Sequence, residues 1–305
     1  MRVSFHSMHS LVELSDQRVP RDSVFARAWK RLHRQTDNVD LLIVGTALVQ
    51  IASTWISGLP YILADCLYPP LLSRWKIQPR ARQTRAALKD VFFHLIAQHM
   101  TLLIGSTLLS ASIKHFDIQW AKQAAHKSLS APLTSFQSHV KEMFVNVLAW
   151  EAMFYGSHRI LHGKLFYRLI HKKHHTFKAP ISLCSNYALN IEQIVGNLLP
   201  GLTGPVINHI RHDSHLVSHW LWFAFGAWLT NATHSGYAVP FNPFLPCTLA
   251  HEYHHLTFYH QLGTFGFMDQ VWKTHGGKDY KRWKAEVADR IFHNMPLHKA
   301  FVKLF

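Results

Sequence analysis

Apolar stretches about as long as a membrane is thick constrain this chain more than any other feature of its sequence. A helix needs roughly 20 mostly apolar residues to cross a hydrocarbon core about 30 Å thick. Hydrophobic residues make up 48% of the chain and charged residues 16%. The sequence therefore predicts an all-α fold, an integral membrane helical bundle, with apolar stretches at 41–72, 91–113, 141–157, 188–208 and 216–233.

Basic residues gather beside these stretches. The formal net charge is +15, and clusters of lysine and arginine lie in residues 18–34 and 74–89. A nucleic-acid-binding protein is expected to carry its basic residues as a stripe on a soluble fold. Clusters beside apolar spans instead orient a membrane protein with its positive side in the cytosol. We therefore expect a membrane, and no nucleic acid, as a partner. The first 38 residues contain no apolar core of a cleavable signal peptide.

The stretch 41–72 is predicted to form a bent hairpin. It lies between two basic clusters that should share the cytosolic side, so it should enter the membrane and return. It is short for two full crossings, and Gly58-Leu59-Pro60 interrupts it. Broken apolar segments are tolerated in membranes where protein covers the freed backbone groups.

The later stretches then alternate in direction. Residues 91–113 should cross outward and 141–157 should return, and the last two stretches should form a second hairpin with its turn on the far side. This topology brings residues 158–187 and everything after residue 234 to the cytosolic face. The predicted architecture is thus a membrane bundle with a cytosolic, histidine-rich helical cap.

Three histidine boxes lie in those two cytosolic regions. The chain has 25 histidines, and core packing alone seldom accumulates so many residues that are costly to bury without a partner. The first box has the spacing H-x-x-x-H, and the other two have H-x-x-H-H. A spacing of four places two imidazoles on one helix face, so the ligands can converge or be divided between two metals. The predicted metal ligands are His158, His162, His171, His174, His175, His234, His251, His254 and His255.

The types of ligand residue narrow the choice of metal ion but do not identify it. Cys66, Cys184 and Cys247 lie far apart and form no C-x-x-C pair, so neither a disulfide framework nor a thiolate zinc site is indicated. An imidazole-rich set without thiolates suits iron, copper, zinc or nickel. No catalytic side chain is expected beyond the metal centre.

The boxes and the residues between them resemble the fatty acid hydroxylase superfamily. The resemblance rests on the run HRILHGKLFYRLIHKKHH, on Ala179-Pro180, Glu192 and Gly204-Pro205, on Thr233-His234-Ser235-Gly236-Tyr237, and on HEYHH. Within the superfamily, Trp75-Lys76-Ile77-Gln78-Pro79 and the His-Ser-Gly-Tyr run resemble the sterol desaturase and C4-methyl sterol oxidase branch. The similarity covers roughly residues 55–280.

The resemblance implies two iron ions per chain, residence in the endoplasmic reticulum membrane and oxidation of a lipid C–H bond by O2. Two irons can share the electrons needed to cleave O2. The sequence contains no flavin or nicotinamide fingerprint, so the resemblance implies cytochrome b5 and its NAD(P)H reductase as electron donors. The chain divides into a basic cytosolic N-terminal segment (1–40), membrane segments with a connecting loop (41–140), a fatty acid hydroxylase-type domain (141–280) and a C-terminal tail (281–305).

The chain departs from the family pattern after the third box. The family usually has Asn-Tyr-Gly where this chain has Gln261-Leu262-Gly263, and Gly-Thr where it has Lys273-Thr274. The first change could alter a contact or a water ligand near the metals.

Imidazole ligands need acceptors for their second ring nitrogens. The candidate carboxylates are Glu192, Glu252 and Asp269. The alternative reading of each is an acidic residue that is simply exposed to solvent. His94 and His99 lie inside a predicted span, where packing or lining of a substrate tunnel is favoured over ligation. His260 and His275 are outside candidates as ligands. An interfacial position is expected for His209, His212, His215 and His219.

Three functions fit these features. The leading hypothesis is a lipid mono-oxygenase acting on a sterol-like or fatty acyl substrate, with C4-methyl oxidation favoured. A desaturase with the same metal core would give a double bond instead of an alcohol. A non-catalytic membrane protein that keeps a structural zinc site is the third.

Overall fold

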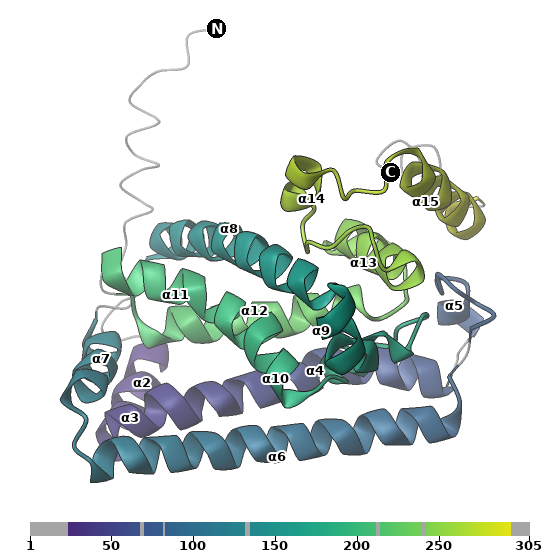
Figure 1. Cartoon of the computed structure of the whole chain (residues 1–305). Helices are drawn as coiled ribbons and strands as arrows, with labels where there is room; N and C mark the ends of the chain where they lie inside the picture. The colour runs from purple at the N-terminus through teal and green to yellow at the C-terminus, as the bar shows by residue number, and fades with distance from the viewer. Residues whose placement is uncertain are drawn as a thin grey trace, which may run out of the picture. The chain divides into compact units, whose positions relative to one another are not determined.

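The computed structural model describes residues 24–67, 70–81, 83–131, 135–211, 214–239 and 242–293. Within these ranges the chain is helical and contains no strand; one isolated bridge pairs Lys76 with Tyr237 (Figure 1). The all-α prediction is confirmed. The fold divides into two compact units. As far as they are described, unit 1 comprises residues up to 51, 100–148 and 202–224, and unit 2 comprises residues 52–99, 149–201 and 225 onward.

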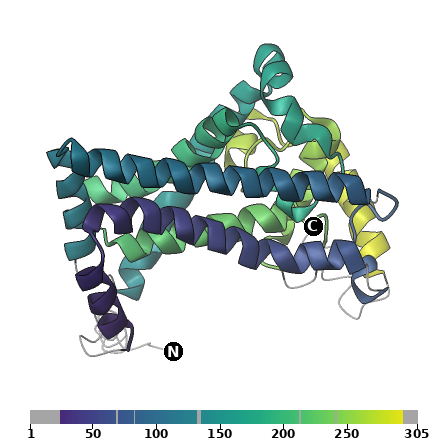
Figure 2. The ribbon, with the colours of Figure 1, turned by 90° about the horizontal axis from the view of Figure 1, so that it is seen from below.

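Among the described residues, two helices are long and apolar enough to cross a membrane. The first runs over Asn38–Leu67 and ends with α4 (Thr46–Leu67), and the second is α6 (Arg85–His115) (Figure 2). Large apolar side chains on both helices are exposed, including Ile56 at 74% and Phe93 at 65%. Rows of exposed apolar side chains on helices of this length suit a hydrocarbon surround.

The predicted hairpin in residues 41–72 is wrong, because α4 continues through both Gly58 and Pro60 as one helix. Gly58 serves close packing and not a break: a Cβ atom there would lie 2.7 Å from Leu183 Cδ2. Neighbouring protein groups let a membrane helix keep a proline in its interior.

Unit 1 holds the beginning of the described chain. It contains α2 (Val24–Gln35), α3 (Asn38–Asp40), the π-helical η1 (Leu41–Gly45) and α7 (Gln119–Ser130). It also contains most of α11 (Leu199–Arg211) and the first half of α12 (Leu216–Thr233). Leu41, Leu129 and Leu216 form one of its apolar clusters.

Unit 1 also corrects the predicted topology. The Trp29 ring of α2 lies 4.8 Å from the His215 ring, which directly precedes α12. The N-terminal helix therefore shares a side with the turn that we predicted on the opposite side of the membrane. The reason is that α4 is one continuous helix where the prediction assumed a hairpin that enters and returns. The basic residues Arg18 and Arg21 lie outside the described residues.

Unit 2 carries the histidine boxes. Its elements are α5 (Pro70–Ser73), the end of α8 (Phe136–Leu161), α9 (Lys164–Leu169), the 3-10 helices η2 (His171–Thr176) and η3 (Ser182–Asn186), α10 (Asn190–Glu192), the π-helical η4 (Gln193–Leu198), α13 (Leu245–Thr257), α14 (Phe267–Trp272) and α15 (Gly277–Phe292). Its largest buried cluster packs Trp75 and Ile77 against Tyr237, Leu249 and Phe292. The segment after α5 is thereby fixed to the elements that carry the third box.

Candidate metal centre

The predicted ligands gather in two sets within unit 2. The first set draws on the last turn of α8 and the residue after it, on η2 and on α13, and the second on η2, α13 and the residue after α12. Within each set, the ligand nitrogens all lie within 4.8 Å of one another. The first set is His158, His162, His171, His175 and His254, and the second is His174, His234, His251 and His255.

Each H-x-x-H-H box serves both sets. In η2 the outer histidines, His171 and His175, belong to the first set, and His174 belongs to the second. In α13 the assignment is reversed, with His251 and His255 in the second set and the middle histidine in the first. The box spacing had left open whether the ligands converge or divide, and the structure shows that they divide.

Most of the rings are oriented by an oxygen acceptor at Nδ1. Because a carbonyl or carboxylate oxygen can only accept, each such Nδ1 carries the proton and donates. Backbone carbonyls do this for four rings and a carboxylate for one. The pairs are His158 to Leu262 O at 2.7 Å, His234 to Thr230 O at 2.9 Å, His254 to His260 O at 2.9 Å, His255 to Phe177 O at 3.0 Å, and His171 to Glu192 Oε1 at 2.7 Å.

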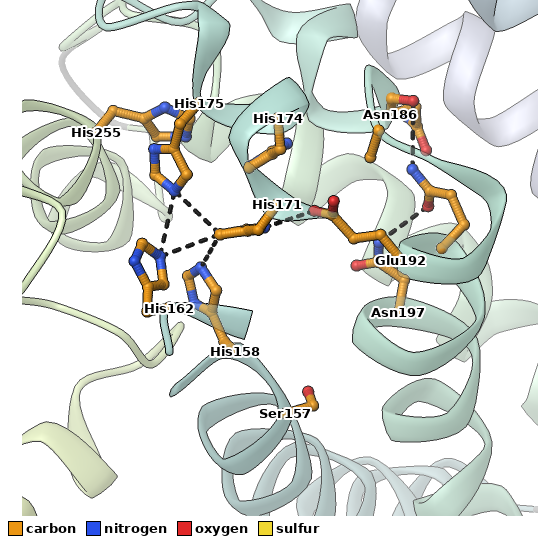
Figure 3. A network of polar contacts seen from close by, with 12 residues as sticks. Ser157, His158, His162, His171, His174, His175, Asn186, Glu192, Asn197 and His255 are labelled. Carbon is orange, nitrogen blue, oxygen red and sulfur yellow. Dashed lines mark hydrogen bonds and ion pairs between the residues drawn. The ribbon is translucent and has the colours of Figure 1, made fainter. Parts of the chain in front are cut away.

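The opposite ring nitrogens then face one another. His158 and His171 both donate from Nδ1, and their Nε2 atoms lie 3.2 Å apart with no proton between them. Figure 3 shows the rings of His158, His162, His171 and His175 converging on one another. A neutral imidazole that donates from Nδ1 presents a lone pair at Nε2, so the contact between His158 and His171 is repulsive unless a cation lies between them.

Burial keeps these rings in the form that binds metal. It lowers the pKa of His234 to about 4 and holds the pKa values of His251 and His254 well below the usual histidine range, with further lowering from neighbouring rings. Metal ligation requires neutral imidazole. The buried, converging lone pairs therefore fit two metal ions, and the all-imidazole donor set suits iron, copper, zinc or nickel.

The three candidate carboxylates differ in their contacts. Glu192 accepts directly from a ring of the first set. Asp269 accepts from the backbone N–H groups of Leu262 and Gly263, both at 2.8 Å, and so fixes the loop whose carbonyl orients His158. Glu252 accepts from Gln78 Nε2 at 2.7 Å, and burial raises its pKa to about 7.

Sequence reasoning missed a second carboxylate that holds this loop. Glu151 is 2% exposed, and its Oε2 accepts from the backbone N–H groups of Thr264 and Phe265, both at 2.9 Å. An acidic residue inside the apolar stretch 141–157 was the available signal, because a charge in such a segment marks a functional position by default. Gln78 was noted only as part of the family resemblance.

The departure from the family pattern falls on this loop. Gln261 has a φ of 55°, and its side-chain amide donates to His275 O at 2.7 Å. Leu262 is 4% exposed and supplies its carbonyl to His158. The Gln261 side chain thus bonds to His275, and Leu262 orients His158 through its backbone carbonyl, so the changed side chains are not the atoms that orient the ligand.

The remaining candidate histidines lie outside both sets. His94 Nε2 donates to Ala188 O at 2.9 Å, and His99 Nδ1 accepts from Trp55 Nε1 at 3.0 Å, which are packing contacts. His260 contributes its backbone carbonyl, and His275 Nδ1 accepts from Gly277 N at 3.0 Å. His209, His215 and His219 belong to unit 1, and His212 lies outside the described residues.

Comparison with known proteins identifies the family. Residues 143–274 match the fatty acid hydroxylase family. The human fatty acid hydroxylase domain-containing protein 2 is 31% identical over 249 residues, which is 80% of this chain and 70% of that protein. Methylsterol monooxygenase 2-2 of Arabidopsis thaliana is 30% identical over 272 residues, covering 84% of this chain and 93% of that protein. The very-long-chain aldehyde decarbonylase GL1-8 of Oryza sativa subsp. indica is 29% identical over 287 residues, covering 87% and 96%. No solved structure matches. The resemblance seen in the boxes is thus confirmed, and the chain belongs to the fatty acid hydroxylase superfamily.

Proposed function

We propose that this chain is a membrane-bound, non-haem di-iron oxygenase that hydroxylates a lipid, with sterol C4-methyl oxidation or fatty acyl hydroxylation as the reaction. The observation that carries the proposal is the division of nine histidines, eight of them buried, into two sets with converging ring nitrogens. Relatives named as a methylsterol monooxygenase and as a fatty acid hydroxylase support the substrate class.

The residues of the two sets would hold one iron each. Bound iron would supply the O2 chemistry that no protein side chain can perform. Around it, the chain's own groups fix the rings: the carbonyls of Leu262, His260, Phe177 and Thr230 hold the protons on Nδ1 and leave Nε2 free. The burial of His254 and His255, which are fully enclosed, keeps bulk water away.

We further propose residence in the endoplasmic reticulum membrane with the boxes facing the cytosol. The basic cluster 74–89 belongs to the same unit as the boxes, and Gln78 of this segment donates to Lys178 O at 3.0 Å and to Glu252. Positive charge marks the cytosolic side. A cysteine at Lys273 should then react with an impermeant reagent from the cytosol, whereas a cysteine at Arg31 in α2, which precedes the helix Asn38–Leu67, should not. Equal labelling of both positions from the cytosol would contradict this topology.

Cytochrome b5, fed by its NAD(P)H reductase, is the proposed electron donor. Exposed lysines flank the boxes, and opposite charges would steer an acidic partner to this face. Lys173 is less suitable for testing this, because its Nζ lies 3.1 Å from His94 Nδ1 and 4.7 Å from the centre of the Tyr187 ring. Reversing the exposed Lys172 and Lys178 to glutamate should slow b5-driven turnover at low salt and spare turnover with a chemical reductant. An unchanged b5-driven rate with full iron content would exclude docking at this face.

The central experiment is metal analysis coupled to product analysis. Protein purified in detergent and loaded anaerobically with iron should hold close to two irons per chain and should convert a sterol or fatty acyl lipid to an alcohol with O2 and reductant. If the purified protein holds only zinc and oxidises no lipid after iron loading, the result would favour a non-catalytic membrane protein with a structural zinc site. A double bond in place of the alcohol would identify a desaturase.

A further inference from the structure

The segment 75–78, between α5 and α6, is joined by its backbone to the turn that follows α12. Ile77 N donates to Gly236 O at 2.9 Å, and Ala238 N donates to Trp75 O at 2.8 Å. Three of the four side chains of the segment are buried. These four residues, here called the strap, are therefore fixed in unit 2 although they belong to no helix.

Lys76 of the strap holds the same turn with its side chain. Its Nζ donates to Ser235 O at 3.3 Å and to Asp65 Oδ1 of α4 at 2.5 Å. Gly236 has a φ of 69°, and a Cβ atom there would lie 3.3 Å from Lys76 Nζ, which favours glycine at this close approach. Because Ser235 directly follows His234, the strap restricts the backbone that carries this ligand of the second set.

Gln78 ends the strap and reaches the third histidine box. A side-chain amide nitrogen has two hydrogens to donate, and Gln78 Nε2 donates to Glu252 Oε1 at 2.7 Å and to Lys178 O at 3.0 Å. Glu252 is fully buried and directly follows His251 in α13. Lys178 directly follows the residue whose carbonyl orients His255. One amide group therefore joins the segments that position two further ligands of the second set.

The place of Glu252 on α13 favours one set over the other. An α-helix turns about 100° per residue, so His255 lies about 60° from Glu252 around the helix and His254 about 160° from it. Holding the carboxylate therefore fixes the side of α13 that carries His251 and His255, which both belong to the second set. His254, of the first set, has its own acceptor in the His260 carbonyl.

The first set is supported by other residues. Glu151 and Asp269 accept from the loop whose Leu262 carbonyl orients His158. Among the described residues, no hydrogen bond joins the strap to this loop. The two sets thus have separate supports within unit 2.

We infer that Gln78 is a positioning residue for the second set alone, and that the two metal sites of this protein therefore load independently. Removing its amide frees Glu252 and the backbone at Lys178, so the rings of His251 and His255 lose the orientation that an ion requires. This inference rests on the part of the proposed function that gives each set one metal ion, and it does not depend on oxidation of a lipid.

The test measures zinc binding to the full chain in detergent, one set at a time. A first-box variant, His158→Ala with His162→Ala, keeps the whole second set, and a second-set variant, His234→Ala with His251→Ala, keeps the whole first set. The tighter zinc step is measured in each against a chromophoric chelator. Adding Gln78→Met to the first-box variant should weaken this step by about 10-fold, as expected for losing a group that orients a ligand. Adding Gln78→Met to the second-set variant should change the step by about 2-fold or less.

A neighbouring glutamine provides the matched control. Gln83 Nε2 donates to Ala179 O at 2.8 Å, so it bonds to the same stretch of backbone without reaching Glu252. Gln83→Met should change zinc binding by about 2-fold or less in both variants.

Equal weakening by Gln78→Met in both variants, or no weakening in the first-box variant, would overturn the inference. Loss of all zinc binding from the first-box variant would also overturn it, because the sets would then not load independently. If Gln78→Met does not fold, Gln78→Met with Glu252→Met leaves no unpaired buried carboxylate and is compared in the same way. A protein that binds zinc as expected at both sets but oxidises no lipid after iron loading would contradict the proposed function and leave this inference standing.

Discussion

Histidines are abundant in both units, but their surroundings differ. In unit 1, His33 Nε2 lies 2.9 Å from Asn38 Oδ1, His139 Nδ1 lies 3.0 Å from Ser218 Oγ, and His215 Nδ1 accepts from Val217 N at 3.0 Å. Each of these nitrogens faces an amide, a hydroxyl or a backbone group. In unit 2, nine histidines bring ring nitrogens together in two sets, within 4.8 Å of one another in each set.

The difference shows that histidine count is a poor guide to a metal centre. What separates the units is the partner of the second ring nitrogen. A backbone carbonyl at Nδ1 fixes the tautomer and commits Nε2 to a cation, whereas a histidine paired with amides and hydroxyls is already satisfied. Among the described residues, the two groups that could hold a metal both belong to unit 2.

The largest effect should come from removing a ring of unit 2. His255→Ala should lower activity by at least about 1,000-fold and reduce bound iron, beyond the roughly 10- to 100-fold effect of losing a group that only orients a ligand. The matched variant His139→Ala in unit 1 should keep both irons. Iron per chain and product formation are the measurements, and equal iron loss in both variants would end the distinction between the units.

Removing the lysine of an ion pair should also have a different effect on stability in the two units. Lys76 Nζ lies 2.5 Å from Asp65 Oδ1 with side-chain exposures of 7% and 9%, and 4.0 Å from the centre of the Tyr237 ring. Lys76→Met leaves a buried carboxylate unpaired, which should cost about 3–5 kcal/mol of unfolding free energy. In unit 1 the Lys114–Asp40 pair is 38% and 34% exposed, so Lys114→Met should cost about 1 kcal/mol or less. Denaturant titration in detergent measures both, and similar losses would refute the contrast.

A smaller effect is expected from changing Glu151, the carboxylate that accepts from the loop residues Thr264 and Phe265. Glu151→Gln weakens the hydrogen bonds to Thr264 and Phe265 and loosens the loop that supplies the Leu262 carbonyl to His158. We expect about 10-fold weaker metal binding at the first set alone, seen as one of two steps in a zinc titration. Glu142 is a buried carboxylate on the same helix, in unit 1, and Glu142→Gln should leave both steps unchanged. A shift of both steps in Glu151→Gln would show a general loss of structure.

The smallest effect should come from restoring the family residue at Gln261. Its φ of 55° lies in the left-handed region that asparagine adopts readily, while the shorter side chain would lose the bond to His275 O. These effects oppose each other, so Gln261→Asn should change stability by about 0.5 kcal/mol or less and metal content not at all. A gain of 10-fold or more in activity would mean that the departure from the family pattern does affect the chemistry.

Local spacing allowed the sequence alone to predict the all-α fold and the family, and to name nine histidines that the structure brings together. Residues four apart on an α-helix share a face whatever surrounds them, so the first and third boxes, at the end of α8 and in α13, carry their geometry within five residues. The second box lies in the 3-10 helix η2, where this rule does not apply. Apolar length predicted α12 with the bounds that the structure shows. Family membership followed from the order of the boxes along the chain.

The tertiary structure decided which histidines share a set, what holds their rings and how the chain is threaded. The acceptors of His158, His234, His254 and His255 are backbone carbonyls, which every residue has and no side-chain pattern reveals. Glu151 and Gln78 act across more than 100 positions of sequence, where local spacing carries no information. The helix α4 continues through Pro60, which local sequence did not indicate, and this single helix removes the hairpin on which the predicted placement of the N-terminal segment rested.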